Sequence, residues 1–482
     1  MLALPAIEPA GSWHAVVVAI ALLGELLSVV FVYRVLVRGG SPASTLLWMV
    51  VILAAPWIGL LLYYLLPRRL QLRRLRRMRT RGARVRGWRS RDATAAAAEP
   101  ARPGLASLLA GTDGFGLVAG NELTWLPTGE QFLAAATAAI LGARRHVHCV
   151  VYIFRPDAAG LQFLALLTRA SRNGTAVRLL YDAIGSFGLE AAHLAPLRAA
   201  GGRAESFMPL LWRRRPFTVN LRNHRKLLVV DGEVAFLGGR NIGNEYFTDR
   251  TSDQRVWLDA MLGLRGPVVD RLQDVFVEDW CTATEEVLAD TFTLPQAVGA
   301  DSVGIVCSGP DREESDLWFA VVQAIGEAEH SIELNSPYLL LPSTLLFALQ
   351  LAAARGVAVC VATNGQPTEA AILYHAQRSH YRKLLAAGIQ VFESIDEYNH
   401  AKVLVVDGKT AVIGSANMDL RSAHLNFEIA AVVIDAPRFV SEVLATLAAR
   451  RQRFRRISRA DLPSKPLSRA LDALCGLLSP IL

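Results

Sequence analysis

The chain has 482 residues, of which 52% are apolar and 20% are charged. This composition excludes a disordered or collagen-like chain, and the length suggests two or three domains. The net charge of +8 is local, because residues 68–91 hold twelve Arg and no acid while the remaining chain has 39 basic and 43 acidic residues. One basic run favours contact with an anionic surface, whereas a nucleic-acid-binding body would be basic more widely, so no nucleic-acid partner is predicted.

Two apolar stretches open the chain, at residues 13–33 and 46–66. Each has 21 residues, enough to cross a hydrocarbon core of about 30 Å as a helix. A cleaved signal peptide fits poorly, because no basic region precedes the first stretch and a second stretch follows at once. Residues 1–67 are therefore predicted to form a two-helix transmembrane hairpin. Its one intramembrane charge, Glu25, either faces the second helix or the partner in a homo-oligomer, or is a tolerated charge.

Residues 68–104 form a juxtamembrane segment that begins with the arginine run and ends in the low-complexity linker DATAAAAEPARPG. The only basic residues in the loop between the two predicted spans are Arg34 and Arg38. The positive-inside rule then places the arginine run, and everything after it, in the cytoplasm. The run is also expected to bind anionic membrane lipid.

After the linker the chain repeats itself. HRKLLVVDGEVAFLGGRN at 224–241 and HAKVLVVDGKTAVIGSAN at 400–417 align without a gap. Both halves alternate helical stretches with short apolar runs, which is typical of α/β layering. The sequence therefore predicts two fused α/β halves, residues 105–295 and residues 296–482, the second ending in an amphipathic tail.

Each repeat contains a buried-strand run closed by Asp-Gly, which is a strong hairpin signal. Side chains alternate along a strand, so the His and Lys of each motif share a face. The motif aspartates lie at the turn and are expected to hold it and to balance charge rather than to contact substrate. The His, Lys and Asp residues of the two motifs are His224, Lys226, Asp231, His400, Lys402 and Asp407.

These residues resemble the phospholipase D superfamily, whose mark is a duplicated HxK(x)4D(x)6GSxN. The second copy matches in full, and the first departs only at Gly239, where the pattern has Ser. With the two apolar stretches, the chain resembles the membrane-anchored bacterial cardiolipin synthases of that superfamily. Further matching stretches are RNHRK (222–226), GGRNIGNEY (238–246), SPY (336–338), ANMDLRS (416–422) and NFE (426–428). The resemblance implies two pseudo-symmetric α/β sandwich halves that share one active site at the bacterial inner membrane.

The resemblance also implies a reaction, in which two phosphatidylglycerol molecules give cardiolipin and glycerol. One histidine would attack phosphorus to form a phosphohistidine, and the other would protonate the departing glycerol and then activate the incoming hydroxyl. Both would need pKa values near neutrality. Which histidine attacks is left open.

The same resemblance assigns the remaining site residues. The six His, Lys and Asp residues of the motifs are the catalytic set, with the lysines on the phosphoryl oxygens. Four further motif residues would bind phosphate: Gly239, Asn241, Ser415 and Asn417. A carboxylate downstream of each motif would orient a histidine, and here these carboxylates are Asp259 and Glu428.

Three other functions fit parts of the sequence: a hydrolytic phospholipase D, a nuclease of the same superfamily and an inactive membrane scaffold. The acidic balance outside the arginine run disfavours the nuclease, and two intact motifs disfavour the scaffold. The cysteines and the other histidines lack metal-ligand spacing and no nucleotide-binding motif occurs, so neither a metal nor a cofactor is predicted.

Two weaker patterns have two interpretations each. FMPLLWRRRPF at 207–217 is either a membrane-dipping segment or a buried loop beside a solvated arginine cluster. The tail at 467–482 places leucines at helical spacing, which fits either core packing or an interfacial helix.

Overall fold

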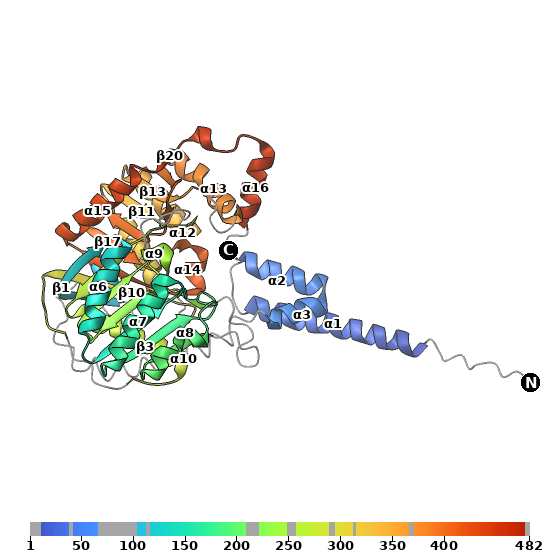
Figure 1. Ribbon diagram of the computed structural model, residues 1–482. Helices are drawn as coiled ribbons and strands as arrows, with labels where there is room; N and C mark the ends of the chain where they lie inside the picture. The colour runs from blue at the N-terminus through green and yellow to red at the C-terminus, as the bar shows by residue number, and fades with distance from the viewer. Residues whose placement is uncertain are drawn as a thin grey trace, which may run out of the picture. The chain divides into compact units, whose positions relative to one another are not determined.

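The structure, a computed structural model, describes residues 11–37, 42–65, 104–111, 116–208, 221–247, 257–288, 295–311, 315–365 and 371–477. The chain divides into two units, Met1–Arg73 and Arg74–Leu482 (Figure 1). The arginine run, nearly all of the linker, residues 209–217 and residues 478–482 lie outside the described residues. The expectations for those segments stay predictions.

The first unit has three apolar helices: α1 (Gly11–Val37), α2 (Pro42–Ala54) and α3 (Pro56–Leu65). Of the described residues, only Ala15–Val37 form a single helix long and apolar enough to cross a membrane. The prediction of one helix over the second apolar stretch is wrong, because the helix ends before Pro56. Proline has no N–H to donate and its ring clashes with the preceding turn, so it ends α2 and begins α3.

Helices α2 and α3 fold back on each other as a tight hairpin. A Cβ on Gly59 would lie 2.6 Å from the Cα of Ile52, so the two backbones touch at a position that only glycine allows. Around the bend, the N–H of Ala55 donates to the carbonyl of Val51 at 3.2 Å and the N–H of Gly59 donates to that of Ala55 at 2.7 Å. The chain therefore reverses while part of its helical bonding is kept.

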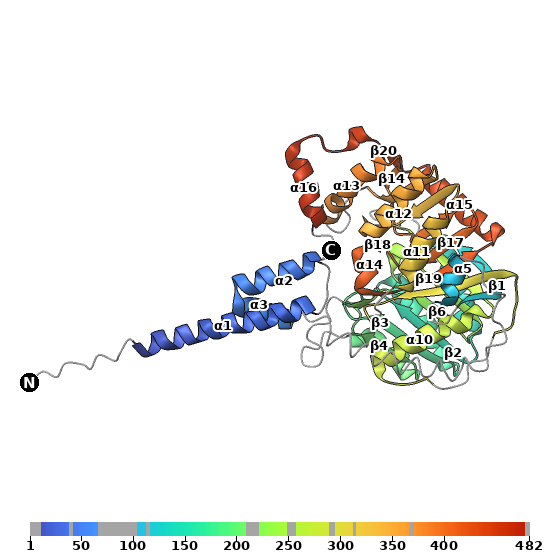
Figure 2. The ribbon, with the colours of Figure 1, turned by 180° about the vertical axis from the view of Figure 1, so that it is seen from behind.

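The bend of this hairpin lies level with the middle of α1, as Figures 1 and 2 show. The ring of Tyr63, at the end of α3, packs edge-on against Phe31 of α1 with ring centres 5.6 Å apart. At the start of α3, the Trp57 indole nitrogen lies 2.9 Å from where a Cβ on Gly24 would be. Helix α3 thus runs parallel to α1 and ends beside its carboxyl end. Glu25 is exposed rather than packed against α2 or α3.

The second unit contains a duplicated mixed sheet. The first half has the strand order β4-β3-β2-β6-β7-β9-β1, and the second half has the order β20-β14-β13-β11-β16-β17-β19-β10. Strands β1 and β10 pair antiparallel and join the halves, with Leu117 opposite Gly304. In both halves three parallel strands (β2, β3, β4 and β11, β13, β14) continue into the antiparallel motif hairpin.

The strands of the first half and its short partners are β1 (Leu117–Leu126), β2 (His146–Val151), β3 (Ala176–Asp182), β4 (Arg203–Phe207), β5 (Arg222–Asn223), β6 (Leu227–Val230), β7 (Val234–Gly238), β8 (Trp257–Leu258) and β9 (Met261–Arg265). Those of the second half are β10 (Asp301–Ser308), β11 (Ser331–Asn335), β12 (Leu339–Leu340), β13 (Ala358–Asn364), β14 (Gln390–Ser394), β15 (Tyr398–Asn399), β16 (Val403–Val406), β17 (Thr410–Gly414), β18 (Met418–Asp419), β19 (Asn426–Ile434) and β20 (Arg455–Ile457).

Helices cover both faces of this sheet. The helices of the unit are α5 (Leu105–Gly111), α6 (Gly129–Gly142), α7 (Ala158–Arg172), α8 (Ala191–Ala199), α9 (Asn244–Phe247), α10 (Val268–Thr284), α11 (Asp316–Glu327), α12 (Ser343–Ala354), α13 (Ala371–Ala386), α14 (Leu420–His424), α15 (Pro437–Arg451) and α16 (Pro466–Leu477). One apolar core joins α10, α15 and strands of both halves, and each half has a further core of its own. The predicted α/β duplication is therefore present, and the shared core fixes the two motifs relative to each other.

Candidate active site

The histidine of each motif is bonded through its backbone to the opposite half. Strand β5 pairs in parallel with β19, and β15 pairs in parallel with β8. At the ends of these pairs, the N–H of His224 donates to the carbonyl of Phe427 at 2.9 Å, and the N–H of His400 donates to the carbonyl of Leu258 at 2.8 Å. The same contact thus occurs twice, and each motif is anchored on the other repeat.

The side chains of the histidines cross between the halves in the same way. Nδ1 of His224 lies 2.9 Å from Oε1 of Glu428, and Nδ1 of His400 lies 2.5 Å from Oδ2 of Asp259. Both carboxylates are fully buried. The orienting residues expected from the sequence therefore contact histidines, but each contacts the histidine of the opposite motif.

Nδ1 of each histidine carries a hydrogen and donates it to the carboxylate that it contacts. A neutral imidazole carries one N–H, and an ionised carboxylate can only accept. Nζ of Lys402 also lies 2.9 Å from Nδ1 of His400, but an ammonium has no lone pair and so cannot accept the Nδ1 hydrogen. We therefore conclude that Nδ1 of His400 carries the hydrogen and donates it to Asp259. Nε2 of each ring is then left with a free lone pair.

Both imidazoles are neutral at pH 7. Burial, together with the charges of the two lysines, lowers the pKa of His224 to about 4 and that of His400 to about 3, although the carboxylates act in the opposite direction. Burial alone would raise the pKa of Asp259, but Lys402 and His400 lower it to about 2. The sequence predicts histidine pKa values near neutrality, and the values in the free site are lower.

The motif lysines lie beside the histidines and are almost fully buried. Nζ of Lys226 donates to the carbonyl of His224 at 2.7 Å, and Nζ of Lys402 donates to the carbonyl of His400. Each lysine lowers the pKa of the histidine in the other half as well as that of its own. The two motifs therefore form one electrostatic site. Burial lowers the pKa of Lys226 well below its usual value, so the site gains from an anion such as phosphate that stabilises the charged lysine.

The motif asparagines differ between the halves. Oδ1 of Asn241 accepts from the N–H of Ile153 at 3.1 Å, and its Nδ2 donates to the hydroxyl of Tyr246 at 2.9 Å. Asn241 thus has one amide hydrogen left for a phosphate. Oδ1 of Asn417 is buried and has no hydrogen-bond partner in the part of the chain that the structure describes.

The motif glycine and serine each lie against the carboxylate of their own half. The hydroxyl of Ser415 donates to Oε2 of Glu428 at 2.5 Å. A Cβ on Gly239 would lie 2.3 Å from Oδ1 of Asp259. Ser415 therefore contacts the carboxylate that orients a histidine, which is a different role from the phosphate contact expected for it.

The motif aspartates lie at the hairpin turns, away from the histidines. Both have left-handed backbones, with φ of 55° at Asp231 and 52° at Asp407. The carboxylate of Asp231 accepts from the N–H groups of residues 144–146, and that of Asp407 accepts from those of residues 329–331, all at 2.7 or 2.8 Å. Their inclusion in the catalytic set is corrected, and the expected turn-holding role agrees with these contacts.

Sequence reasoning missed the aromatic wall of the site. Tyr152 packs edge-on against His224 with ring centres 4.7 Å apart. Trp257 and Tyr246 lie 5.1 and 5.7 Å from His400 by the same measure. Tyr246 belongs to a stretch that the sequence singled out, and Trp257 lies two residues before Asp259, but only the pairing of β8 with β15 places Trp257 beside the imidazole of His400.

The comparisons with known proteins agree with this site. A sequence model described as cardiolipin synthase, PLD-like domain, matches residues 137–280 and 321–450, and one described as phospholipase D-nuclease N-terminal matches residues 26–66. A cardiolipin synthase of Geobacillus kaustophilus is 33% identical over 87% of this chain and 85% of that protein. One of Geobacillus thermodenitrificans is 33% identical over 94% of this chain and 92% of that protein.

A solved structure shares the fold. Phosphatidylserine synthase of Haemophilus influenzae superimposes with a TM-score of 0.59 over 75% of this chain and 95% of that chain. The two sequences are 16% identical, so this likeness concerns the arrangement of helices and strands alone.

Proposed function

This chain belongs to the cardiolipin synthase family of the phospholipase D superfamily and is a phosphatidyltransferase, and we propose that it joins two phosphatidylglycerol molecules into cardiolipin and releases glycerol. The observation that carries the proposal is the pair of crossed contacts, His224 with Glu428 and His400 with Asp259. They give two imidazoles with free Nε2 atoms beside two buried lysines. Such a site can share nucleophile and acid between its two halves.

In the first step, Nε2 of one histidine attacks the phosphorus of a phosphatidylglycerol. The N–P bond forms as the bond from phosphorus to the glycerol oxygen breaks, and the second histidine donates its Nε2 proton to that oxygen. The second histidine must take up this proton beforehand, although its pKa in the free site is low. The negative phosphodiester offsets the lysine charges and raises that pKa, so substrate binding itself favours the protonated form.

In the second step, the histidine that donated its proton to the glycerol oxygen accepts a proton from the terminal hydroxyl of a second phosphatidylglycerol. That oxygen attacks phosphorus, the N–P bond breaks and cardiolipin is released. One phosphodiester replaces another, so the exchange needs no energy-rich donor. The phosphodiester raises the lowered pKa of Lys226, so that Lys226 and Lys402 neutralise the non-bridging oxygens, and the remaining amide hydrogen of Asn241 joins them.

Reconstitution of the full-length protein in phosphatidylglycerol vesicles tests this function. Transfer gives cardiolipin and free glycerol in equal amounts, whereas hydrolysis by the same histidines gives phosphatidic acid and glycerol. We expect cardiolipin as the main lipid product, and no turnover by His400→Asn. Phosphatidic acid as the main product would instead support the phospholipase D alternative.

We also propose how the first unit sits in a bacterial inner membrane. Residues 1–33 contain no Lys or Arg, Arg34 lies in the last turn of α1, Arg38 follows that helix in the sequence, and the arginine run follows α3 in the sequence. The α2–α3 hairpin returns the end of α3 to the carboxyl end of α1. We therefore expect the chain to leave both helices on the same side of the membrane, which the positive-inside rule makes the cytoplasmic side. Helix α1 then crosses once, the hairpin re-enters from the cytoplasmic side, and the catalytic unit is cytoplasmic. This arrangement replaces the two spans expected from hydropathy.

A further inference from the structure

Helix α16 presents an exposed apolar face. Leu467, Leu471 and Leu474 are 83%, 44% and 60% exposed. Their spacing of four and three residues places all three on one side of the helix. Three exposed leucines side by side are costly in water, and such a face marks an interaction surface.

The side of α16 next to the leucine face is fixed on α13. Cys475 is buried in a small apolar cluster with Ala376 of α13 and Leu340 of β12. Oδ1 of Asp472 lies 2.7 Å from Nδ1 of His375, also on α13. These contacts fix α16 on α13 and leave the three leucines exposed. Figure 1 shows α16 beside α13 at the edge of the catalytic unit.

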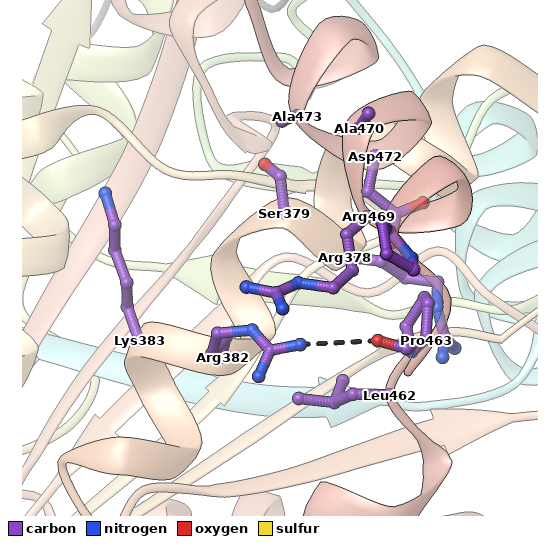
Figure 3. A pocket seen from close by; sticks show the side chains of 11 residues that line it. Arg378, Ser379, Arg382, Lys383, Leu462, Pro463, Arg469, Ala470, Asp472 and Ala473 are labelled. Atoms are coloured by element: carbon purple, nitrogen blue, oxygen red, sulfur yellow. Dashed lines mark hydrogen bonds between the residues drawn. The ribbon is translucent and has the colours of Figure 1, made fainter.

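Between the two helices lies a cavity of about 440 Å³ (Figure 3). Four basic side chains line it: Arg378, Arg382, Lys383 and Arg469. Asp472 is the one acid in the lining, and its carboxylate is taken by His375. The cavity thus has an excess of positive charge and suits an anion.

Part of the basic lining is already held in place. The guanidinium of Arg378 donates to the carbonyl of Asp461 at 2.6 Å and to the hydroxyl of Tyr374 at 2.9 Å. Arg382 donates to the carbonyl of Pro463 at 3.4 Å, the contact drawn in Figure 3. Lys383 and Arg469 are exposed, and neither forms an ion pair with a described carboxylate. These two side chains are free to bind a ligand.

We propose that α16 and this cavity form a docking site for an anionic phospholipid in the membrane surface. The leucine face enters the boundary between headgroups and acyl chains, and the basic residues bind the lipid phosphate. A soluble phosphate would account for the charges but not for the leucines on the helix that lines the same cavity. A bilayer surface satisfies both observations, because its acyl chains accommodate the leucines and the phosphates of neighbouring headgroups reach the basic residues on the adjoining side of α16.

The site also lies next to the catalytic centre. Leu340, which packs under α16, belongs to β12, and β12 pairs with β18 directly after Asn417. Docking of α16 therefore holds this edge of the catalytic unit at the lipid surface. The inference concerns membrane contact and stands whether the enzyme transfers or hydrolyses.

A fluorophore on α16 tests the docking. All five native cysteines are buried, so Leu471→Cys in the full-length protein can be labelled selectively with an environment-sensitive dye. Leu161→Cys on α7 is the matched control, because Leu161 is 46% exposed and Leu471 is 44% exposed. In nanodiscs we expect the dye at position 471 to brighten about twofold when phosphatidylglycerol replaces half of the phosphatidylcholine, and the dye at 161 not to change. Equal responses at the two positions would overturn the proposal.

The charge requirement is tested in the same assay. Lys383→Gln and Arg469→Gln change exposed side chains, and together they are expected to remove most of the response to phosphatidylglycerol, while Arg469→Lys retains it. An undiminished response in the double Gln variant would overturn the role of the cavity. Added inorganic phosphate at 10-fold excess over lipid should leave the signal unchanged, and loss of the signal would identify a site for soluble anions instead.

Discussion

Gly239 and Asp259 lie so close that a Cβ on Gly239 would be 2.3 Å from Oδ1 of Asp259. In the second half, the corresponding Ser415 donates its hydroxyl to Glu428 at 2.5 Å. The small motif residue of each half therefore depends on the carboxylate beside it. In the first half, the Asp259 carboxylate occupies the space that a serine side chain at position 239 would need. The departure of the first motif from the superfamily pattern is a packing requirement of Asp259.

Gly239→Ser should therefore be far more harmful than its mirror image, Ser415→Gly. The new side chain must displace Asp259 from His400, and we expect cardiolipin formation to fall about 10²-fold or more, the scale of a lost acid or base. Ser415→Gly removes one hydrogen bond to Glu428, which still has Ser422 at 2.9 Å, and should cost at most about tenfold. Glycerol release from phosphatidylglycerol vesicles measures both. Wild-type activity in Gly239→Ser would contradict this interpretation.

The crossed pairs predict which variants behave alike. A donor lipid with a p-nitrophenyl leaving group needs no general acid, because nitrophenolate leaves unprotonated. In a single turnover, variants of the acid histidine should therefore release nitrophenol at nearly the parent rate, because only the first step is measured, whereas variants of the nucleophile should not. Because the pairs cross, Asp259→Asn should group with His400→Asn, and Glu428→Gln should group with His224→Asn.

This experiment also identifies the nucleophile, which pseudo-symmetry leaves open. The surface variant Glu233→Gln serves as the control, since the Glu233 side chain is 67% exposed. If Asp259→Asn instead followed His224→Asn with both donor lipids, the carboxylate would not act through the imidazole that it contacts.

Much of the site could be predicted from the sequence because each motif is a short continuous segment and the two copies align without a gap. The motif hairpins and the shared face of each His and Lys depend on neighbouring residues. The place of Asp231 at its turn is local as well, but its carboxylate bonds to residues 144–146, which are 85 to 87 residues away. The crossing of the carboxylates does not, since His224 and Glu428 are 204 residues apart and meet only through β5 and β19. Strand alternation cannot reveal such a pairing.

Two other expectations failed because the sequence does not show burial or bending. The histidines were expected near neutrality, but the pKa of each depends on how deeply the folded chain encloses it. The second apolar stretch has the same hydropathy whether it is straight or folded. Pro56 was the available signal for the bend, and Gly59 the signal for the close contact that follows it.

The low histidine pKa values make stability depend on pH in a defined direction. Unfolded histidine has a pKa of about 6.5, so between that pH and about 4 the unfolded chain binds protons that folded His224 and His400 do not. The free energy of unfolding should fall with decreasing pH in this window, by up to about 1.4 kcal/mol per unit for each histidine, and the contribution is fully present above it. The apparent Tm of the parent in detergent should drop more from pH 7 to pH 5 than that of the His224→Asn/His400→Asn variant. Equal drops would show that the imidazoles do not resist protonation.

The membrane arrangement of the first unit is open to a direct test. With α1 as the single span and α2–α3 as a re-entrant hairpin, Ser12→Cys lies outside the cell and Ser41→Cys lies in the cytoplasm. A thiol reagent that cannot cross membranes should label position 12, and not position 41, in intact spheroplasts, and inside-out vesicles should give the reverse. The native cysteines are buried and provide a low background. Two full spans would place Ser41 outside and Ser12 inside, so the opposite labelling pattern would restore the hairpin expected from hydropathy and require the bend at Pro56 to straighten in lipid.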